Sequence, residues 1–274
     1  MKKAAIYVFI VIISISLVLF SISMFSGLFK QKTGVIFFDV GQGDSALIKL
    51  PNNKVILIDG GPDKLVINRL GKELPYFKRV INYLIISHFH DDHVIGFLEL
   101  IKRYKVKNII YIEESEKPII IKDLLNLAKK EGVNLIPLKD TLIIDYSSDC
   151  SLKLINPEIL EVPDDPNNSI ITKFNCRGIK ALFTGDNPEK VEKALINKGI
   201  DLSSDVFKAS HHGSKSANSE DFLRAIGLKL LIISVGVDNR FGHPSFDVLD
   251  RAKYLNITIK RTDELGSIRI SGGD

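Results

Sequence analysis

The segment His88-Phe89-His90-Asp91-Asp92-His93 decides the fold, because it gathers three imidazoles and two carboxylates within six residues. An apolar run over residues 83–87 leads into it, and apolar side chains over residues 94–101 recur at helical spacing after it. We therefore place the motif between a strand and a helix. Side chains two apart in an extended stretch point the same way, so His88 and His90 predict one metal site.

Asp92 and His93 stand at the start of the predicted helix and point in another direction, which predicts a second metal a few ångströms away. The other three histidines lie in His211-His212-Gly213 and Gly242-His243-Pro244, each after a predicted strand. Loops at strand ends collect functional groups. We predict metal contacts for His211 and His243 and catalytic roles for Asp92, His211 and His212, although spacing alone does not decide which of these loop histidines is the last ligand.

Carboxylates elsewhere in the chain complete the predicted centre. Asp186 ends a predicted strand and is expected to bridge the two metals, with a helix N-cap before Pro188 as the alternative. Asp59 ends a hairpin and is expected to orient a ligand histidine, with a plain turn residue as the alternative. The residues that we assign to supporting or substrate-binding roles are Asp44, Asp59, Asn168, Ser214 and Lys215.

The rest of the chain alternates strands and helices without an internal boundary, so residues 34–274 are expected to form one layered α/β domain. The predicted strands are 35–40, 46–50, 54–58, 83–87, 108–112, 151–155, 170–175, 179–184, 206–209 and 229–235, and the predicted helices follow His93 or cover 121–131, 188–198, 219–226 and 245–254. Residues 258–270 close the domain.

The N-terminus is the most apolar part of the chain. No charged side chain occurs from Ala4 to Phe29, and about 20 apolar residues suffice to cross a bilayer. Neither a small-x-small cleavage site nor a cysteine that could carry a lipid follows. We predict that residues 1–30 form a single-pass anchor in the cell membrane, with the catalytic domain on the outer side.

Composition excludes few classes of protein. The net charge of +4 does not indicate a strongly basic nucleic-acid-binding protein. Cys150 and Cys176 lack Cys-x-x-Cys spacing, so a zinc knuckle and a thioredoxin-like centre are not supported. They are either a disulfide of an extracellular domain or two unrelated thiols, and we favour unrelated thiols.

The motifs together resemble the metallo-β-lactamase fold superfamily, and within it the soluble domain of ComEC-type DNA-uptake proteins. The motifs span residues 35–270 in the order of that family: Phe38-Asp-Val-Gly-Gln-Gly-Asp-Ser45, Ile58-Asp-Gly-Gly61, Ser87-His-Phe-His-Asp-Asp-His93, Phe183-Thr-Gly-Asp186, Ser210-His-His-Gly-Ser214 and Asn239-Arg-Phe-Gly-His-Pro244. The resemblance implies an αββα sandwich with metals at one edge, and ligand roles for His88, His90, Asp92, His93 and Asp186.

The sequence departs from the superfamily pattern at Pro166-Asn-Asn-Ser169, where a third histidine for the first metal is usual. Water, Asn168 or no ligand is then expected in that position. One anchor cannot form a pore, so the transport role of DNA-uptake channels is not carried over.

We predict hydrolysis of a phosphodiester, with nucleic acid as the substrate and His211 or His212 protonating the leaving oxygen. The loop Gly213-Ser214-Lys215 is suited to a phosphate.

Imidazole and carboxylate ligands favour two Zn²⁺ ions, with Mn²⁺ or Fe²⁺ as alternatives. Hydrolysis of another ester (a cell-wall choline phosphate, a thioester or a β-lactam) and a non-enzymatic membrane-tethered binding protein are competing hypotheses. No protein partner is evident.

Overall fold

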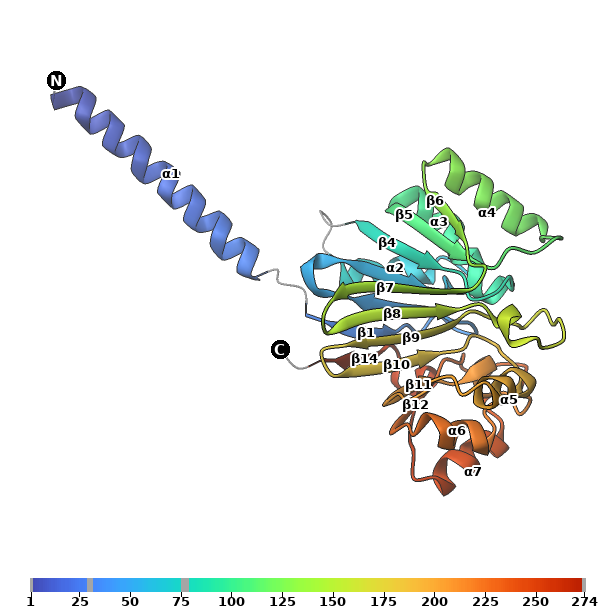
Figure 1. The fold of residues 1–274 in the computed structure, drawn as a ribbon. Helices are drawn as coiled ribbons and strands as arrows, with labels where there is room; N and C mark the ends of the chain where they lie inside the picture. The colour runs from blue at the N-terminus through green and yellow to red at the C-terminus, as the bar shows by residue number, and fades with distance from the viewer. Residues whose placement is uncertain (1, 29–31, 75–78, 273–274) are drawn as a thin grey trace.

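Two sheets packed face to face form the body of the protein in this computed structural model, which describes residues 2–28, 32–74 and 79–272 (Figure 1). The first sheet has the strand order β14-β1-β2-β3-β4-β5-β6. Its strands are β1 (Gly34–Phe37), β2 (Ala46–Lys49), β3 (Val55–Ile58), β4 (Val80–Ile85), β5 (Lys105–Tyr111), β6 (Asn134–Pro137) and β14 (Ile268–Ser271).

The second sheet has the order β13-β12-β11-β10-β9-β8-β7. Its strands are β7 (Thr141–Ser147), β8 (Cys150–Ile155), β9 (Ile171–Cys176), β10 (Ile179–Phe183), β11 (Val206–Lys208), β12 (Leu230–Ile233) and β13 (Thr258–Arg261). Strands β3, β4, β5 and β6 pair in parallel in the first sheet, and β10 to β13 do so in the second.

Helices cover the outer face of each sheet. Those of the first are α2 (Leu65–Glu73), α3 (Asp91–Arg103) and α4 (Ile119–Lys130), and those of the second are α5 (Glu189–Asn197), α6 (Glu220–Ile226) and α7 (Phe246–Tyr254), while α8 (Thr262–Leu265) joins β13 to β14. Short 3₁₀ turns occupy Pro51–Asn53, Pro157–Leu160 and Ser210–Gly213. One apolar core fills the space between the sheets, and a further core lies under each helical layer. The predicted αββα sandwich is confirmed.

Three elements lie outside every predicted segment: α2, β6 and β7. The closing region 258–270, for which no element type was predicted, holds β13, α8 and the start of β14. Strand β7 lies at a sheet edge and alternates exposed with half-buried residues, so it carries no fully buried apolar face. Hydrophobic periodicity reports burial, and an edge strand of this kind gives only a weak signal. The predicted strands and helices otherwise match the observed ones to within a few residues at their ends.

The packing of α3 against the loop after β3 positions the histidine motif. The amide of Gly60 donates to the carbonyl of His93 at 2.6 Å, and the amide of Gly96 donates to the carbonyl of Gly61 at 3.1 Å. A Cβ atom at Gly96 would lie 2.0 Å from the carbonyl oxygen of Gly60. Only glycine permits this approach, which brings His93 next to Asp59.

Cys150 and Cys176 form a disulfide, so the interpretation as unrelated thiols is wrong. The two residues are direct cross-strand partners of β8 and β9, with their Cα atoms 4.0 Å apart. Spacing in sequence could not show this, because the pairing depends on the register of the two strands. Both side chains are buried in the core between the sheets.

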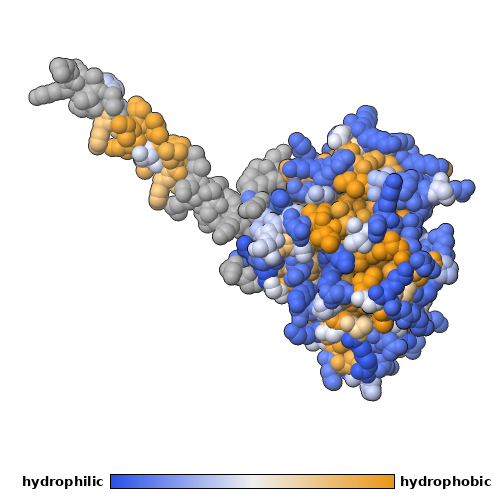
Figure 2. All heavy atoms as spheres, viewed as in Figure 1, coloured by the Kyte–Doolittle hydropathy of each residue, from blue (hydrophilic) through white to orange (hydrophobic). Residues whose placement is uncertain are grey.

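The N-terminal helix α1 covers Lys2–Leu28. Its described side chains are exposed, and they include Tyr7, Phe9, Leu17 and Phe20. Figure 2 shows most of this stretch in orange. Among the described residues, no helix meets the length and hydropathy that a membrane crossing requires. Residues 1, 29 and 30 of the predicted anchor lie outside the described residues, and the anchor stays a prediction.

Replacing Gly96 with alanine is expected to lower the free energy of unfolding by at least about 3 kcal/mol, because the added methyl group meets backbone atoms that have no room to move. Gly71 is the matched control: it lies in α2 with open space around its Cα, and Gly71→Ala should raise stability by up to about 1 kcal/mol. Urea denaturation measures both. Equal stability of the two variants would contradict the close approach of α3.

Candidate metal centre

The first group of candidate ligands is His88, His90 and Asp186, whose ligand atoms all lie within 4.8 Å of one another. His88 and His90 follow β4 in the extended segment before α3, and the Nε2 atom of His88 is 2.9 Å from the Nδ1 atom of His90. The Oδ2 atom of Asp186 is 3.8 Å from the Nε2 atom of His88. The two imidazoles therefore converge on one point, as their spacing predicts, and a carboxylate from the second sheet meets them.

The second group is Asp92, His93 and His212. The Oδ2 atom of Asp92 lies 3.2 Å from Nε2 of His212 and 3.8 Å from Nε2 of His93. Asp186 stands between the two groups, with its Oδ1 atom 3.5 Å from Nε2 of His93 and its Oδ2 atom 3.8 Å from Nε2 of His212. This is the arrangement that a bridging carboxylate requires.

Two buried atoms at the middle of this arrangement have no hydrogen-bond partner among the residues that the structure describes: Nε2 of His93 and Oδ1 of Asp186. Buried polar atoms are nearly always satisfied, so such a pair calls for a ligand between them. Imidazole nitrogen and carboxylate oxygen are common ligands of divalent transition metals. The residues present thus fit a pair of metal ions.

Charge at the centre is unbalanced toward the carboxylates. Burial alone would lower the pKa of His93, but Asp186 and Asp59 outweigh it and hold that pKa well above its usual value. Burial likewise opposes protonation of His212, yet Asp186 and Asp44 raise the pKa of His212 to about 9. Histidines that retain protons at neutral pH mark a site that attracts cations, and metal binding there would release those protons.

Asp186 is positioned by residues that the sequence did not single out. Its amide donates to the hydroxyl of Ser169 at 3.0 Å, and the side chain of Asn187 exchanges two hydrogen bonds with the backbone of Ser169, both at 2.8 Å. Asp186 is not a helix N-cap, because α5 begins at Glu189 and Pro188 occupies the cap position. The alternative reading of Asp186 is therefore wrong.

Asn168 is not brought to the centre. Its side-chain amide donates to the carbonyl of Pro163 at 3.2 Å, and Asn168 lines a different pocket together with Glu114 and Asp164. The neighbouring Ser169 turns inward instead and supports Asp186. The short turn over residues 165–168 separates the directions of the two side chains, which the sequence could not show.

Asp59 lies against His93. Its Oδ2 atom is 2.9 Å from Nδ1 of His93, and its two carboxylate oxygens accept from the amide and the hydroxyl of Ser87, each at 2.8 Å. These contacts direct Nε2 of His93 toward Asp186, which is the orienting role expected of Asp59.

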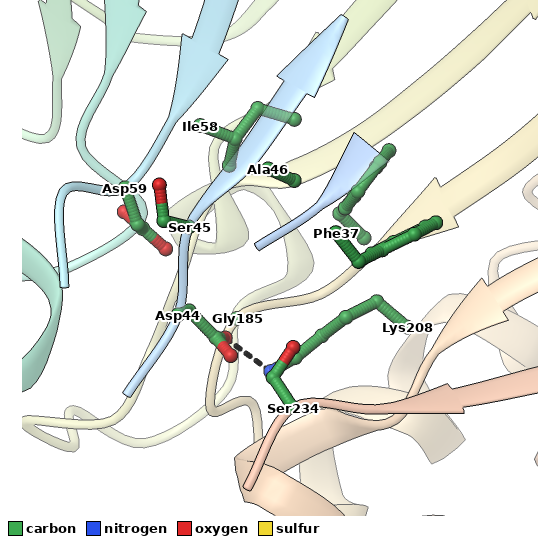
Figure 3. Close-up of a pocket in the computed structure, with 10 residues that line it drawn as sticks. Phe37, Asp44, Ser45, Ala46, Ile58, Asp59, Gly185, Lys208 and Ser234 are labelled. Carbon is green, nitrogen blue, oxygen red and sulfur yellow. Dashed lines mark ion pairs between the residues drawn. The ribbon is translucent and has the colours of Figure 1, made fainter. Parts of the chain in front are cut away.

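Asp44 pairs with Lys208, a buried cation that the sequence did not single out (Figure 3). Lys208 ends β11 and is 3% exposed, and Figure 3 shows its side chain running to Asp44 beside Ser234. The cavity beside the pair is about 10 Å³, which holds one water at most. Burial would raise the pKa of Asp44, but Lys208, with His212 and His93, holds it well below its usual value.

His212 takes its orientation from this region. Its Nδ1 atom is 3.0 Å from the carbonyl of Ser234 and 3.5 Å from Oδ1 of Asp44, which leaves Nε2 facing Asp92. His211 and His212 both have left-handed backbone, with φ of 49° and 53°. Such conformations cost free energy in residues other than glycine and concentrate at functional sites. They turn two consecutive imidazoles in different directions.

His211 and His243 lie at the mouth of the centre rather than in either ligand group. The side chain of His211 is 30% exposed, and its Nε2 atom is 3.7 Å from Oδ2 of Asp186. Both line an open pocket of about 480 Å³ with Gln42, Pro62, His90, Asp91, Asp92, Asp186, His212, Asn239, Arg240 and Phe241. Of the three loop histidines, the structure groups His212 with the candidate ligands, so the metal contacts predicted for His211 and His243 stay predictions.

Ser214 and Lys215 do not line this pocket. The hydroxyl of Ser214 is 3.0 Å from that of Ser216 within the same loop, and Lys215 is exposed. The phosphate-binding role expected of this loop has no support in its geometry.

Lys208→Met is expected to lower the free energy of unfolding by about 3 kcal/mol or more, because it leaves the carboxylate of Asp44 buried without its cation. Adding Asp44→Asn should restore much of the loss, since no unpaired charge remains. Lys193→Met is the matched control, because Lys193 forms an exposed pair with Glu189, and it should change stability little. Denaturation of the wild type, Lys208→Met, Asp44→Asn, the double variant and the Lys193→Met control measures the coupling, and strictly additive losses at Lys208 and Asp44 would contradict it.

Comparison with known proteins identifies relatives of this chain. The chain is 28% identical over 252 residues to ComE operon protein 3 of Bacillus subtilis, covering 86% of this chain and 32% of that protein. It is 28% identical over 261 residues to Recombination protein 2 of Haemophilus influenzae, covering 94% and 31%. The chain thus spans about a third of the length of these curated relatives, which are ComEC-type competence proteins as the motifs predict.

Among solved structures, the metallo-beta-lactamase fold protein YhfI of Bacillus subtilis superimposes with a TM-score of 0.60 at 12% identity, covering 87% of this chain and 100% of YhfI. At that identity the likeness shows the fold alone. Residues 38–237 match the family described as the metallo-beta-lactamase superfamily. A match over most of the two-sheet body, with the histidine motif and Asp186 inside it, means that this chain belongs to the metallo-beta-lactamase superfamily.

Proposed function

We propose that the chain is a phosphodiesterase that cleaves nucleic acid with a metal-activated water. The superfamily consists largely of hydrolytic metalloenzymes, and its fold binds divalent metal ions, often two. The observation that carries the proposal is the position of Asp186, which lies between two groups of candidate ligands at the base of an open pocket. A substrate in that pocket meets both groups at once.

Each candidate ligand has a role that follows from its position. Asp186 would bridge the two metals, His88 and His90 would hold the first, and Asp92, His93 and His212 would hold the second. When bound, two divalent ions lower the pKa of a shared water and neutralise charge on phosphoryl oxygens. His211 is half-buried at the pocket mouth and in reach of solvent, so it is placed to carry a proton between the leaving oxygen and bulk water.

Three considerations favour a nucleic-acid phosphodiester: the first separates it from a β-lactam or a thioester, and the other two separate it from a choline phosphate as well. The paired ligand groups suit a reaction in which both the attacking and the leaving oxygen develop charge. A relative whose alignment covers 94% of this chain is named for recombination, a process that acts on nucleic acid. Arg240 adds a cation to the pocket lining. Zn²⁺ is the proposed metal, since the candidate ligands are imidazoles and carboxylates without thiolate.

The purified full chain, assayed with single-stranded DNA, duplex DNA and a generic phosphodiester under Zn²⁺ or Mn²⁺, should cleave at least one of them. Asp186→Asn should reduce kcat/KM by at least about 100-fold, beyond the 10- to 100-fold loss typical of an outer partner. Asp123→Asn, an exposed carboxylate on α4, is the matched control and should keep full activity. Hydrolysis of β-lactams or thioesters alone would replace the nuclease assignment, and a protein that binds neither metal would end it.

We also propose that α1 holds the domain at the cell membrane with its active site on the outer side. The described part of α1 exposes a predominantly apolar surface (Figure 2). A buried disulfide persists in oxidising compartments and is rare in the cytosol. The apolar helix favours attachment to the membrane, and the disulfide favours a domain on its outer side.

If the domain is extracytoplasmic, protein denatured directly from cells should resist a maleimide reagent at Cys150 and Cys176 until a reductant is added. Reduction should then lower the free energy of unfolding by about 3 kcal/mol, because the disulfide closes a loop with a sequence separation of 26. A Cys150→Ala, Cys176→Ala variant should show no such effect of the reductant. Immediate labelling of both thiols without reductant would contradict the placement.

A further inference from the structure

An exposed aromatic ring stands at the mouth of the metal-centre pocket. Phe241 is 57% exposed, although phenylalanine usually lies inside a fold, and it lines the pocket together with Arg240 and His243. The loop that carries these residues joins β12 to α7 and has no part in the candidate ligand groups. Neither the metal chemistry nor the core accounts for this ring.

The rings of His211, His243 and Phe241 form a series that leads away from the centre. The ring centroids of His211 and His243 are 5.7 Å apart, and those of His243 and Phe241 are 6.1 Å apart with planes inclined by only 18°. The guanidinium carbon of Arg240 lies 5.2 Å from the ring centroid of Phe241. Since His211 also approaches Asp186, the series runs from the bridging carboxylate to the surface.

The loop is held in place by hydrogen bonds. The side-chain amide of Asn239 donates to the carbonyls of His243 at 2.7 Å and Gly236 at 3.2 Å, and its oxygen accepts from the amide of His243 at 3.0 Å. The amide of Gly236 in turn donates to the side chain of Gln42 at 3.3 Å. Phe241 is therefore presented on a tethered loop, and little entropy is lost when a ligand packs against it.

The guanidinium of Arg240 is available to bind an anion. It is exposed and forms no ion pair with any residue that the structure describes. A guanidinium beside an exposed aromatic ring favours a flat, electron-rich partner carried on an anionic backbone. A nucleobase joined to phosphates has both properties, and base–aromatic stacking contributes about 1–3 kcal/mol per base.

We propose that Phe241 and Arg240 form a stacking platform for an unpaired base of single-stranded nucleic acid, next to the phosphate that lies at the metal centre. The assignment rests on the proposed phosphodiesterase function and gives it a substrate class. In a duplex both faces of each base are covered by neighbouring base pairs, so only a single strand offers a free face. Phe241 is then a specificity-determining residue that selects the single strand.

Binding to the platform can be read directly, because the chain contains no tryptophan. Phe241→Trp introduces the only indole of the protein, and its fluorescence should be quenched by a phosphorothioate-linked single strand, which resists cleavage during the measurement. An abasic strand of the same length should leave the emission unchanged. Phe246→Trp is the matched control: Phe246 is 83% exposed at the start of α7, does not line the pocket, and should report no quenching.

Kinetics give the second measurement. Phe241→Ala should lower kcat/KM for a single strand by about 5- to 150-fold, mainly through KM, and should leave the rate on the abasic strand unchanged. Phe246→Ala should match the wild type on both substrates. Equal losses on the base-containing and abasic strands, or quenching by duplex as strong as by single strand, would overturn the platform. Absence of any phosphodiester cleavage by the wild type would instead end the proposed function, while the quenching still tests the platform.

Discussion

The carboxylate of Asp186 is a buried negative charge on which the whole centre depends. It comes from the end of β10 in the second sheet, and it meets His88 and His93 from the first sheet and His212 from the loop after β11. A buried charge is stable only beside a counter-charge. Asp186 raises the pKa of His93 and of His212, so protons on these imidazoles, or divalent cations in their place, would supply it.

Parallel strands explain why these groups meet. The loop with His88 and His90 follows β4, Asp59 follows β3, Asp186 follows β10, and the loop with Phe241 follows β12. These strands are parallel to a neighbour in their own sheet, so their carboxyl ends lie along common edges, where ligands bind in α/β folds. The loops at those edges accept strained conformations, such as the positive φ of His211 and His212, because the strands beneath them are rigid.

A layer of supporting contacts fixes the ligands from behind. Asp59 and Ser87 hold His93, Ser169 holds Asp186, and the pair of Asp44 and Lys208 lies behind His212. These side chains are buried, and they set the direction of the imidazoles of His93 and His212. The β12–α7 loop contributes Asn239, Arg240, Phe241 and His243 to the lining at the front of the pocket.

The sequence by itself determined the local unit of a strand, three histidines with two aspartates, and a helix, from which a pair of metal groups could be predicted. These features depend on side-chain direction over a few residues, which strand and helix periodicity fix. The αββα fold followed from the resemblance of several motifs to a family, and the bridging place of Asp186 from its position at the end of another predicted strand. Tertiary structure alone decided that His212 rather than His243 lies next to Asp92, and that Lys208 faces Asp44. It also decided that Ser169, and not Asn168, contacts Asp186, and that Cys150 pairs with Cys176. Asp92 and His212 are 120 residues apart, and no periodic signal spans that distance; their contact follows from strand order and loop conformation across two sheets.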